Sequence, residues 1–165
     1  YEMTSSLVGS EMCIRDRWTP MHAEESALWS LDRKDGMEKA YCCFNSNARD
    51  FARFGQLLLN NGQWDGQQLI SPAYLAEATS PDTRLVYKDL GKPNHCYGFQ
   101  YWILDYKGMK IPYMRGILGQ YVFTLPEKNA VIVRLGHKRS DTYTADQHYP
   151  DDINTWLDAA MDLLQ

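Results

Sequence analysis

The stretch that decides the fold runs from Arg115 to Leu135 and reads RGILGQYVFTLPEKNAVIVRL. It holds two runs of aromatic and β-branched residues, separated by the sequence Pro-Glu-Lys-Asn. A proline, charged residues and an asparagine between two such runs are typical of a hairpin loop. Because so short a connection can join only antiparallel neighbours, we expect Arg115–Leu125 and Ala130–Leu135 to be adjacent antiparallel strands.

A third aromatic run precedes these two, and a helix follows them. Tyr97–Tyr106 reads YGFQYWILDY and ends at the turn signal Lys107-Gly108. We therefore predict three antiparallel strands between Tyr97 and Leu135. Pro150 and Asp151-Asp152 begin a terminal helix, because acidic residues favour the positive end of a helix. Its apolar residues recur at helical spacing and predict a face that covers the sheet.

Helices also precede the strands. Asn47 is placed to cap a helix over Ala48 to about Asn61, with Asp50 three residues on as in a capping box. Gly62 supplies the left-handed stop. Ser71-Pro72 opens a second, short helix. Helices, then an antiparallel meander, then a helix laid on it indicate an α+β fold.

The segment before the capped helix carries a hairpin signal and two of the four cysteines. Apolar runs at Ala27–Asp32 and Met37–Phe44 flank a polar turn that ends in Asp-Gly. Cys42 and Cys43 are adjacent, and neighbouring residues of a strand point to opposite faces. We therefore expect no bridge between them, and we interpret the cysteines as buried thiols.

Composition excludes several classes of protein. The chain has 165 residues, the length of one domain, with 17 Lys+Arg against 21 Asp+Glu and a net charge of −4. That balance, without a basic patch, argues against a nucleic-acid partner. No apolar stretch approaches the length of a membrane span. CxxC and HExxH are both absent, and the histidine and cysteine spacing matches no zinc pattern, so we expect neither a metal nor a cofactor.

The sequence contains no recognisable activated nucleophile. No serine has a lysine three residues later; Ser30 and Ser46 come closest, each followed at that spacing by an arginine. No tyrosine has an asparagine two residues later, and the GxSxG, P-loop and GxGxxG signatures are absent. A serine nucleophile needs a base within hydrogen-bonding reach, so we predict no catalytic residue within this chain.

One remaining feature bears on function: Gly116-Ile117-Leu118-Gly119-Gln120, which we expect on the middle strand. Glycines in an otherwise bulky strand mark a bulge or the close approach of another group to the backbone. Two interpretations stay open. The segment is either a plain bulge, or a backbone N–H there binds a substrate oxygen as part of an oxyanion hole.

Three stretches, in this order, resemble the C-terminal half of class C β-lactamase-like serine hydrolases, in the 6-aminohexanoate-dimer hydrolase and esterase-like branch. They are Glu38–Gln68, Gly98–Ile103 and Gly116–Arg134, within a resemblance that covers about Pro20–Leu164. The resemblance implies part of a β-lactamase/transpeptidase-like domain: an antiparallel sheet with a C-terminal helix, plus part of the helical subdomain, to which the helix at Ala48 would belong.

The family carries Ser-x-x-Lys, Tyr-x-Asn or a variant, and a third motif on the strand that edges the site. Only the third maps onto this chain, as Gly116–Gln120. By this resemblance the Ile117 N–H would complete an oxyanion hole with the N–H of a serine upstream. Leu118 departs from the polar residue of some relatives, which leaves substrate preference open. Tyr41 and Phe44 would lie at the pocket rim or pack in the core.

The first residues do not fit this domain. The run Ser6–Arg17, SLVGSEMCIRDR, resembles a translated sequencing-adapter read-through that recurs in assembled metagenomic data. We expect residues 1–17 to be a non-native artefact and 18–165 to be the C-terminal part of the domain, with nucleophile and base upstream.

The parent protein would hydrolyse small-molecule esters, amides or β-lactams through an acyl-serine intermediate, and this chain alone would be inactive. The alternative is a non-catalytic module, either a penicillin-recognising relative or a peptide- or carbohydrate-binding α+β domain. The resemblance leaves the compartment open.

Overall fold

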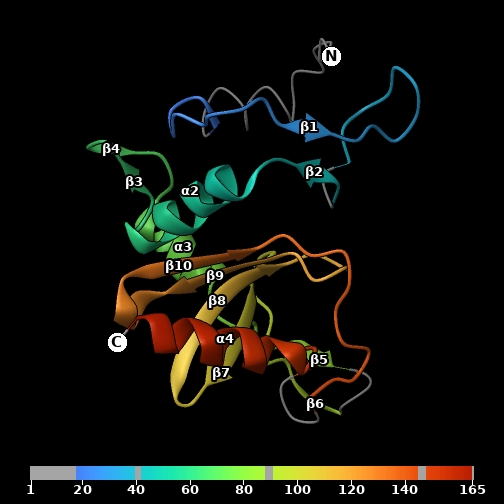
Figure 1. Cartoon of the computed structure of the whole chain (residues 1–165), viewed down its shortest axis with the longest axis vertical. Coiled ribbons are helices and arrows are strands. Elements are labelled where there is room, and N and C mark those ends of the chain that lie inside the picture. The colour runs from blue at the N-terminus through green and yellow to red at the C-terminus, as the bar shows by residue number, and fades with distance from the viewer. Residues whose placement is uncertain (1–17, 40–41, 88–90, 145–147, 165) are drawn as a thin grey trace.

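The computed structural model describes residues 18–39, 42–87, 91–144 and 148–164. Residues 1–17, expected to be an artefact, therefore lie outside the described part of the chain. At the centre lies a four-stranded antiparallel sheet, in the order β10–β9–β8–β7, so that each strand pairs with its neighbour in sequence (Figure 1). The strands are β7 (Trp102–Tyr106), β8 (Met109–Arg115), β9 (Tyr121–Leu125) and β10 (Ala130–Arg134).

The antiparallel meander is confirmed, but the prediction of three strands is wrong. Met109–Arg115 is a strand of its own, paired with β7 from Tyr106↔Met109 to Trp102↔Tyr113. The sequence does not indicate this strand, because it contains Pro112 and proline is rare inside strands. The structure accommodates Pro112 because only the last three residues of β8 pair with β9, so Pro112 is paired with β7 alone.

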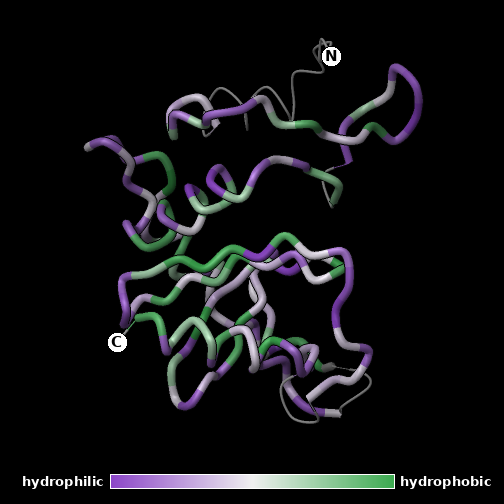
Figure 2. The backbone as a smooth tube through the Cα atoms, in the orientation of Figure 1, coloured by the Kyte–Doolittle hydropathy of each residue, from purple (hydrophilic) through white to green (hydrophobic). Residues whose placement is uncertain are grey.

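Strand β9 is buried along its whole length, because both faces of the sheet are covered. On one face lies the terminal helix α4 (Asp152–Leu163), as predicted. Ile153 and Leu157 of this helix join Tyr121, Phe123 and Leu125 of the strand in one buried cluster. Figure 2 shows hydrophobic segments concentrated where these layers meet.

The capped helix α2 (Ala48–Leu59) covers the opposite face of the sheet. We expected it to belong to a helical part of the domain; it packs directly on β9 and β10. Gly55 allows this close approach, because a Cβ atom there would lie 2.4 Å from Val131 Cγ1 and 3.3 Å from Val122 Cγ1. A larger side chain at this position would push the helix off the sheet.

The far side of α2 supports a second, smaller core. Trp18, Met21 and Leu57 form its buried centre, with Phe44 packed against them. Strands β1 (Leu28–Trp29) and β2 (Phe44–Asn45) pair antiparallel above the helix. The predicted hairpin is therefore present, although its regular pairing is only two residues long. Helix α2 therefore packs against the sheet on one side and against this second core on the other, so its buried residues do not all lie on one face.

The N-terminus of α2 follows the predicted cap and adds a contact that the sequence does not reveal. Asn47 Oδ1 accepts the Asp50 N–H at 2.8 Å. Asp50, the other residue of the predicted capping box, is fully buried. Its carboxylate accepts the N–H groups of Glu24 at 2.8 Å and Glu25 at 3.0 Å, and so ties the preceding loop to the helix.

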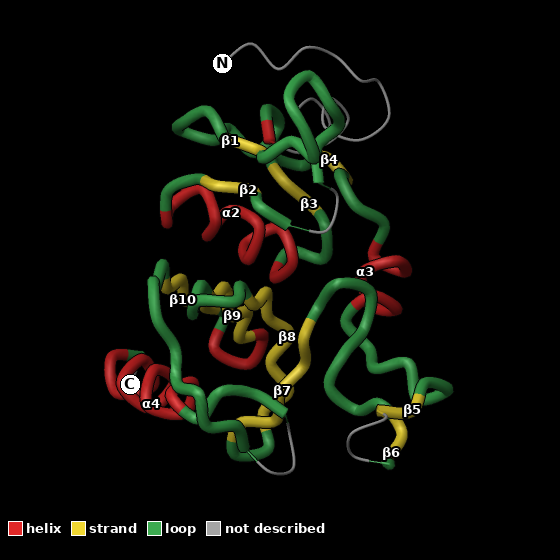
Figure 3. Tube along the Cα trace, turned by 90° about the vertical axis from the view of Figure 1, so that its right-hand side faces the viewer, coloured by secondary structure: helices red, strands yellow, loops and turns green. Residues whose placement is uncertain are grey.

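The remaining elements are short and lie between α2 and the sheet in sequence (Figure 3). The Asp65-Gly66 turn joins two paired residues on each side, and the helix opened by Pro72 forms as predicted. None of the helices within the described residues is long and apolar enough to cross a membrane. These elements are β3 (Gln63–Trp64), β4 (Gln67–Gln68), α3 (Pro72–Ala78), β5 (Val86–Tyr87) and β6 (Lys92–Pro93). Within the sheet, the 3₁₀ turn η2 (Pro126–Lys128) joins β9 to β10.

Replacing Gly55 by valine should lower the free energy of unfolding by about 1–3 kcal/mol, because the new side chain overpacks the contact with Val131. Urea unfolding measures the effect. Arg49→Val, at a largely exposed position of the same helix, is the control for placing a valine in this helix away from the sheet. Equal losses in the two variants would contradict close packing of α2 on the sheet.

Asp50→Asn should destabilise the protein by about 1–3 kcal/mol at pH 7, because one acceptor of a buried hydrogen-bond network is lost. Burial alone would raise the pKa of Asp50, but the Glu24 and Glu25 N–H groups, Asn47 and Arg53 together lower it. A lowered folded-state pKa stabilises above the unfolded pKa of about 3.9, and the stabilisation disappears as pH falls through the folded value.

The stability difference between wild type and Asp50→Asn should therefore shrink below about pH 4. Chemical unfolding between pH 7 and pH 3 measures this dependence. Asp35→Asn, a change at an exposed turn residue, controls for the general effect of losing one carboxylate. A difference that stays constant across this pH range would contradict an ionised, hydrogen-bonded Asp50.

Candidate functional site

The segment Gly116–Gln120 forms the turn between β8 and β9, at one end of the sheet. We expected it on the middle strand, and this placement is wrong: strand pairing between β8 and β9 begins only at Arg115↔Tyr121. The turn is closed by the Gly116 N–H, which donates to the Gln120 carbonyl at 2.7 Å. Ile117 is 80% exposed at its tip.

Most backbone N–H groups of this turn are already used. Gly119 donates to the Gly116 carbonyl at 3.4 Å, and Leu118 donates to Gln120 Oε1 at 3.1 Å. Within the part of the chain that the structure describes, the Ile117 N–H has no hydrogen-bond partner. It is therefore available to an acceptor from outside the chain.

Three long side chains hold the turn in place. Gln120 Nε2 donates to the Gly136 carbonyl at 2.8 Å, and Arg139 Nε donates to the Ile117 carbonyl at 2.9 Å. Arg134 Nη1 donates to the Gly119 carbonyl. Because each side chain binds a carbonyl of the turn or of the segment after β10, the turn is fixed from several sides.

Gly119 is the residue that this arrangement requires. Its φ is +83°, a conformation that side chains with a Cβ atom rarely adopt. A Cβ atom there would also lie 2.7 Å from the Lys138 carbonyl oxygen. The second glycine of the sequence motif is thus explained by backbone conformation and by the closeness of the segment after β10.

A hollow of about 210 Å³ opens beside the turn, and Gly116 and Ile117 form part of its wall. Arg115 lies over the ring of Trp102, with the guanidinium carbon 3.3 Å from the ring centroid. Arg115 Nη1 also donates to the His148 carbonyl at 3.0 Å. Arg139 and Tyr143 close the other side, with the Arg139 guanidinium carbon 5.0 Å from the Tyr143 ring centroid.

Neither nearby buried tyrosine can serve as a base at neutral pH. Burial is the main cause that raises the pKa of Tyr113, although Arg115 opposes it. Burial, with the negative charge of Asp152, raises the pKa of Tyr121 to about 12. Both phenols stay protonated, and the turn therefore contributes backbone donors and arginine side chains rather than a proton acceptor.

The serines flagged by the sequence carry no catalytic arrangement. The Ser46 hydroxyl is buried and has no hydrogen-bond partner among the described residues, so no base activates it. Ser30 is exposed, between β1 and the hairpin turn. Within the described ranges, His, Cys, Asp and Glu side chains form no cluster of three that could hold a metal ion.

Phe44, expected at a pocket rim or in the core, lies among aromatic rings: its centroid is 5.1 Å from that of Trp18 and 5.4 Å from that of Trp29. It does not line the hollow beside the turn. Tyr41, the other residue expected there, lies outside the described residues. The structure thus gives Phe44 a packing role and separates it from the Gly116–Gln120 turn.

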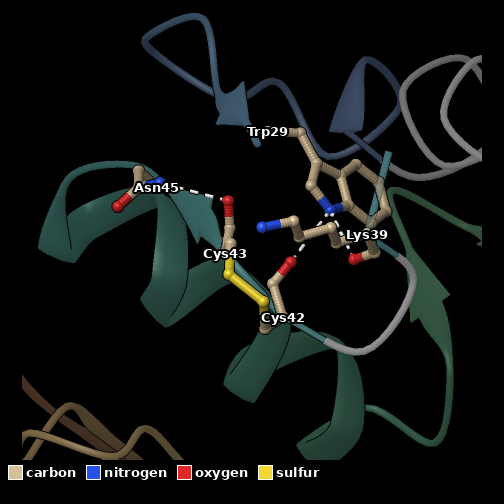
Figure 4. Close-up of a disulfide and its surroundings, with 5 residues drawn as sticks. All are labelled: Trp29, Lys39, Cys42, Cys43 and Asn45. Carbon is tan, nitrogen blue, oxygen red and sulfur yellow. Dashed lines mark hydrogen bonds between the residues drawn. A yellow bond between two sulfur atoms is a disulfide. The ribbon is translucent and has the colours of Figure 1, made fainter. Parts of the chain in front are cut away.

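The cysteine pair beside Phe44 corrects another expectation. Cys42 and Cys43 form a disulfide (Figure 4). We expected no bridge because we assigned both residues to a strand, whereas Cys43 has a φ of +75° and is not extended. Trp29 Nε1 donates to the carbonyls of Lys39 and Cys42 at 3.0 and 3.1 Å, and so anchors the pair. Cys96 is buried, as interpreted.

Comparison with known proteins identifies the fold of the chain. No family model and no curated protein matches the chain. Among solved structures, the chain is similar to the "Putative 6-aminohexanoate-dimer hydrolase from Bacillus anthracis", with a TM-score of 0.70 and 25% sequence identity over 92% of this chain. The chain spans 37% of that protein's length. The chain thus has the fold of part of a β-lactamase-like hydrolase domain, as the sequence resemblance implies.

Gln120→Ala should loosen the turn while leaving the fold intact, because it removes the acceptor for the Leu118 N–H and the donor to Gly136. We expect faster amide hydrogen exchange confined to residues 116–120 and a global loss of about 1 kcal/mol or less. Exchange measured by mass spectrometry tests this. Gln63→Ala, at an exposed strand position, is the control. Unchanged exchange in the turn would contradict the bracing role of Gln120.

Proposed function

We propose that this chain forms one wall of the active site of a serine hydrolase that cleaves ester, amide or β-lactam bonds of small molecules. The wall is the Gly116–Gln120 turn. The observation that carries the proposal is the Ile117 N–H, which has no partner among the described residues. The peptide on either side of Ile117 is held, because the Gly116 carbonyl accepts the Gly119 N–H and the Ile117 carbonyl accepts Arg139 Nε. The hydrolase similarity supports the reaction class.

The chemistry needs such a donor at one step. When a serine attacks a carbonyl carbon, the carbonyl oxygen becomes an oxyanion, and preorganised N–H groups stabilise it more than they stabilise the substrate. In the family that this chain resembles, the second donor would be the N–H of the serine itself. An N–H that is already held in place does not have to reorient when the charge develops.

The nucleophile and its base would come from residues outside these 165. The chain contains no serine with a lysine three residues later, and Ser46 has no base beside it. The proposed reaction requires a serine, a base that takes its proton and two N–H donors to the oxyanion. This chain supplies one of the two donors, the Ile117 N–H. The chain by itself should therefore be catalytically inactive.

The purified 165-residue chain should neither turn over a chromogenic ester or a β-lactam nor be labelled by a fluorophosphonate probe. The reason is the missing serine–lysine pair. Mass spectrometry of the probe-treated protein measures labelling at any serine. Stoichiometric labelling of a serine in this chain, or turnover abolished by Ser30→Ala or Ser46→Ala, would contradict the proposal.

The DNA sequence upstream of this coding region tests the positive half of the proposal. We expect it to encode Ser-x-x-Lys followed by a tyrosine motif, and the longer protein to be labelled at that serine. In that protein Ile117→Pro, which removes the N–H, should lower kcat by about 10²–10³-fold, whereas Ile117→Ala should leave it nearly unchanged. A longer protein without a nucleophile would support the non-catalytic alternative instead.

A further inference from the structure

We propose that Cys42 and Cys43 form a redox-active pair, a site at which low-molecular-weight thiols open and reform the disulfide. Opening the bond releases the backbone that holds β1 and β2 together above α2. The inference concerns the second core of the chain, on the side of α2 away from the sheet, and it does not depend on the proposed hydrolase function.

The first argument is that this disulfide cannot act as an ordinary structural cross-link. A disulfide stabilises a fold mainly because it limits the freedom of the unfolded chain, and the effect grows with the length of the loop that it closes. Cys42 and Cys43 are neighbours in the sequence, so their bond closes the shortest loop possible. The bond joins no distant segments, and its effect is confined to the local backbone.

The second argument is the backbone conformation at the pair. Cys43 has a φ of +75°, in the left-handed region that residues with a Cβ atom rarely adopt. Cysteine has no intrinsic preference for this region, whereas a bond between neighbouring side chains restricts the backbone of both residues. We infer that the bond holds Cys43 in this conformation, and that reduction allows its φ to return to negative values.

The hydrogen bonds around the pair depend on this conformation. Trp29 Nε1 donates to the Cys42 carbonyl at 3.1 Å (Figure 4). The Cys43 carbonyl accepts the Ser30 N–H at 3.0 Å and Asn45 Nδ2 at 3.1 Å. A rotation of the Cys43 backbone would turn these carbonyls away from their donors. The oxidation state of the two sulfurs is therefore coupled to the position of Trp29 and to the contact between the strands.

The pair is also accessible from solution. Cys43 is an exposed residue and Cys42 is half-buried, so a dissolved thiol approaches the bond from the Cys43 side. Exposed disulfides and those with restrained geometry are the ones that exchange with thiols, whereas structural disulfides resist reduction by glutathione. Cys96, by contrast, is buried.

The exchange consumes two thiols. The first, as its thiolate, attacks the Cys43 sulfur and forms a mixed disulfide, and the Cys42 sulfur leaves as a thiolate that takes a proton from solvent. A second thiolate attacks the sulfur of the bound small molecule, and the Cys43 sulfur leaves and is protonated in turn. The pair gains two electrons and two protons, and the two small thiols become one disulfide. Because the cysteines are adjacent, they stay together after reduction, and the reverse exchange can reform the bond.

The effect of opening should stay within the second core. Phe44 follows the pair directly, and its ring centroid lies 5.1 Å from that of Trp18 and 5.4 Å from that of Trp29. It also contacts Phe51 and Phe54 of α2, at 6.0 and 6.2 Å between centroids. The sheet packs on the other side of this helix. We therefore expect reduction to loosen β1 and β2 and to leave β9 unchanged.

The first experiment measures the oxidation state of the pair. A Cys13→Ser variant removes the cysteine that lies outside the described residues. The folded protein is equilibrated with reduced and oxidised glutathione at a series of ratios, and free thiols are alkylated and located by peptide mass spectrometry. We expect Cys42 and Cys43 to change together from disulfide to dithiol within this series, and the buried Cys96 to stay unmodified. A pair that remains a disulfide in reduced glutathione alone, or that is found as two thiols in oxidised glutathione alone, would overturn the proposal.

The second experiment measures the conformational response. We expect reduction to shift the NMR signal of the Trp29 indole N–H and to speed amide exchange at Ser30 by at least about tenfold, with no change in residues 121–125. Identical Trp29 signals and Ser30 exchange rates in the oxidised and reduced protein would overturn the coupling.

Two variants at one position separate the bond from the backbone conformation. Both lack the disulfide, but Cys43→Gly adopts a positive φ without cost, whereas Cys43→Ser does not. We expect Cys43→Gly to keep the Trp29 signal and the slow Ser30 exchange of the oxidised protein, and Cys43→Ser to resemble the reduced protein. Cys42→Ser removes the bond from the other side and replaces Cys43→Ser if that variant does not fold. Equal Ser30 exchange in the glycine and serine variants would overturn the claim that the bond acts through the Cys43 backbone.

Discussion

Burial of strand β9 on both faces is the constraint on which the rest of the structure depends. Phe123 and Leu125 on one face require the cover of α4, and Val122 on the other requires the cover of α2. A slip of one residue would exchange the two faces, so the register of β9 against β8 and β10 is strongly specified. Gly55 lets the second cover come close enough, because no side chain separates helix from sheet at that point.

The candidate site follows from this constraint. The turn Gly116–Gln120 leads directly into β9, so a fixed register for β9 also fixes where the turn emerges. Among the described residues, arginines from β8, β10 and the segment after β10 donate to backbone carbonyls rather than to carboxylates. One arrangement thus accounts for two properties: a peptide with an available N–H, and a concentration of positive charge in an acidic chain.

Sequence reasoning predicts the regular elements better than their partners. The cap at Asn47, the helix after it, the hairpin between β9 and β10 and the terminal helix all follow from local patterns. The strand β8 does not, because a proline is typical of a linker, and Pro112 is tolerated only because the pairing of β8 with β9 ends before it. The burial of Asp50 depends on a loop 25 residues earlier in the chain, which no local pattern reveals.

The candidate site likewise contains residues that the sequence marks and residues that only the folded chain brings together. The glycines and Gln120 stand together in the sequence and mark the turn, although as part of a strand rather than as its entry. Trp102, Arg115, Arg139 and Tyr143 come from separate segments and meet only in the folded chain. The two arginines could have been found from the arginines that flank the turn in a chain that is acidic overall, but no sequence signal marks Trp102 or Tyr143.

The central claim is that the Ile117 N–H stabilises an oxyanion, and a structure of the phosphonylated longer protein tests it most directly. A fluorophosphonate adduct on the upstream serine would carry an oxygen in the position of the oxyanion. We predict that this oxygen lies about 2.7–3.1 Å from the Ile117 nitrogen, the range of an oxyanion hydrogen bond. An adduct whose oxygens all point away from the turn, or an Ile117 nitrogen bonded to another group of the protein, would contradict the account.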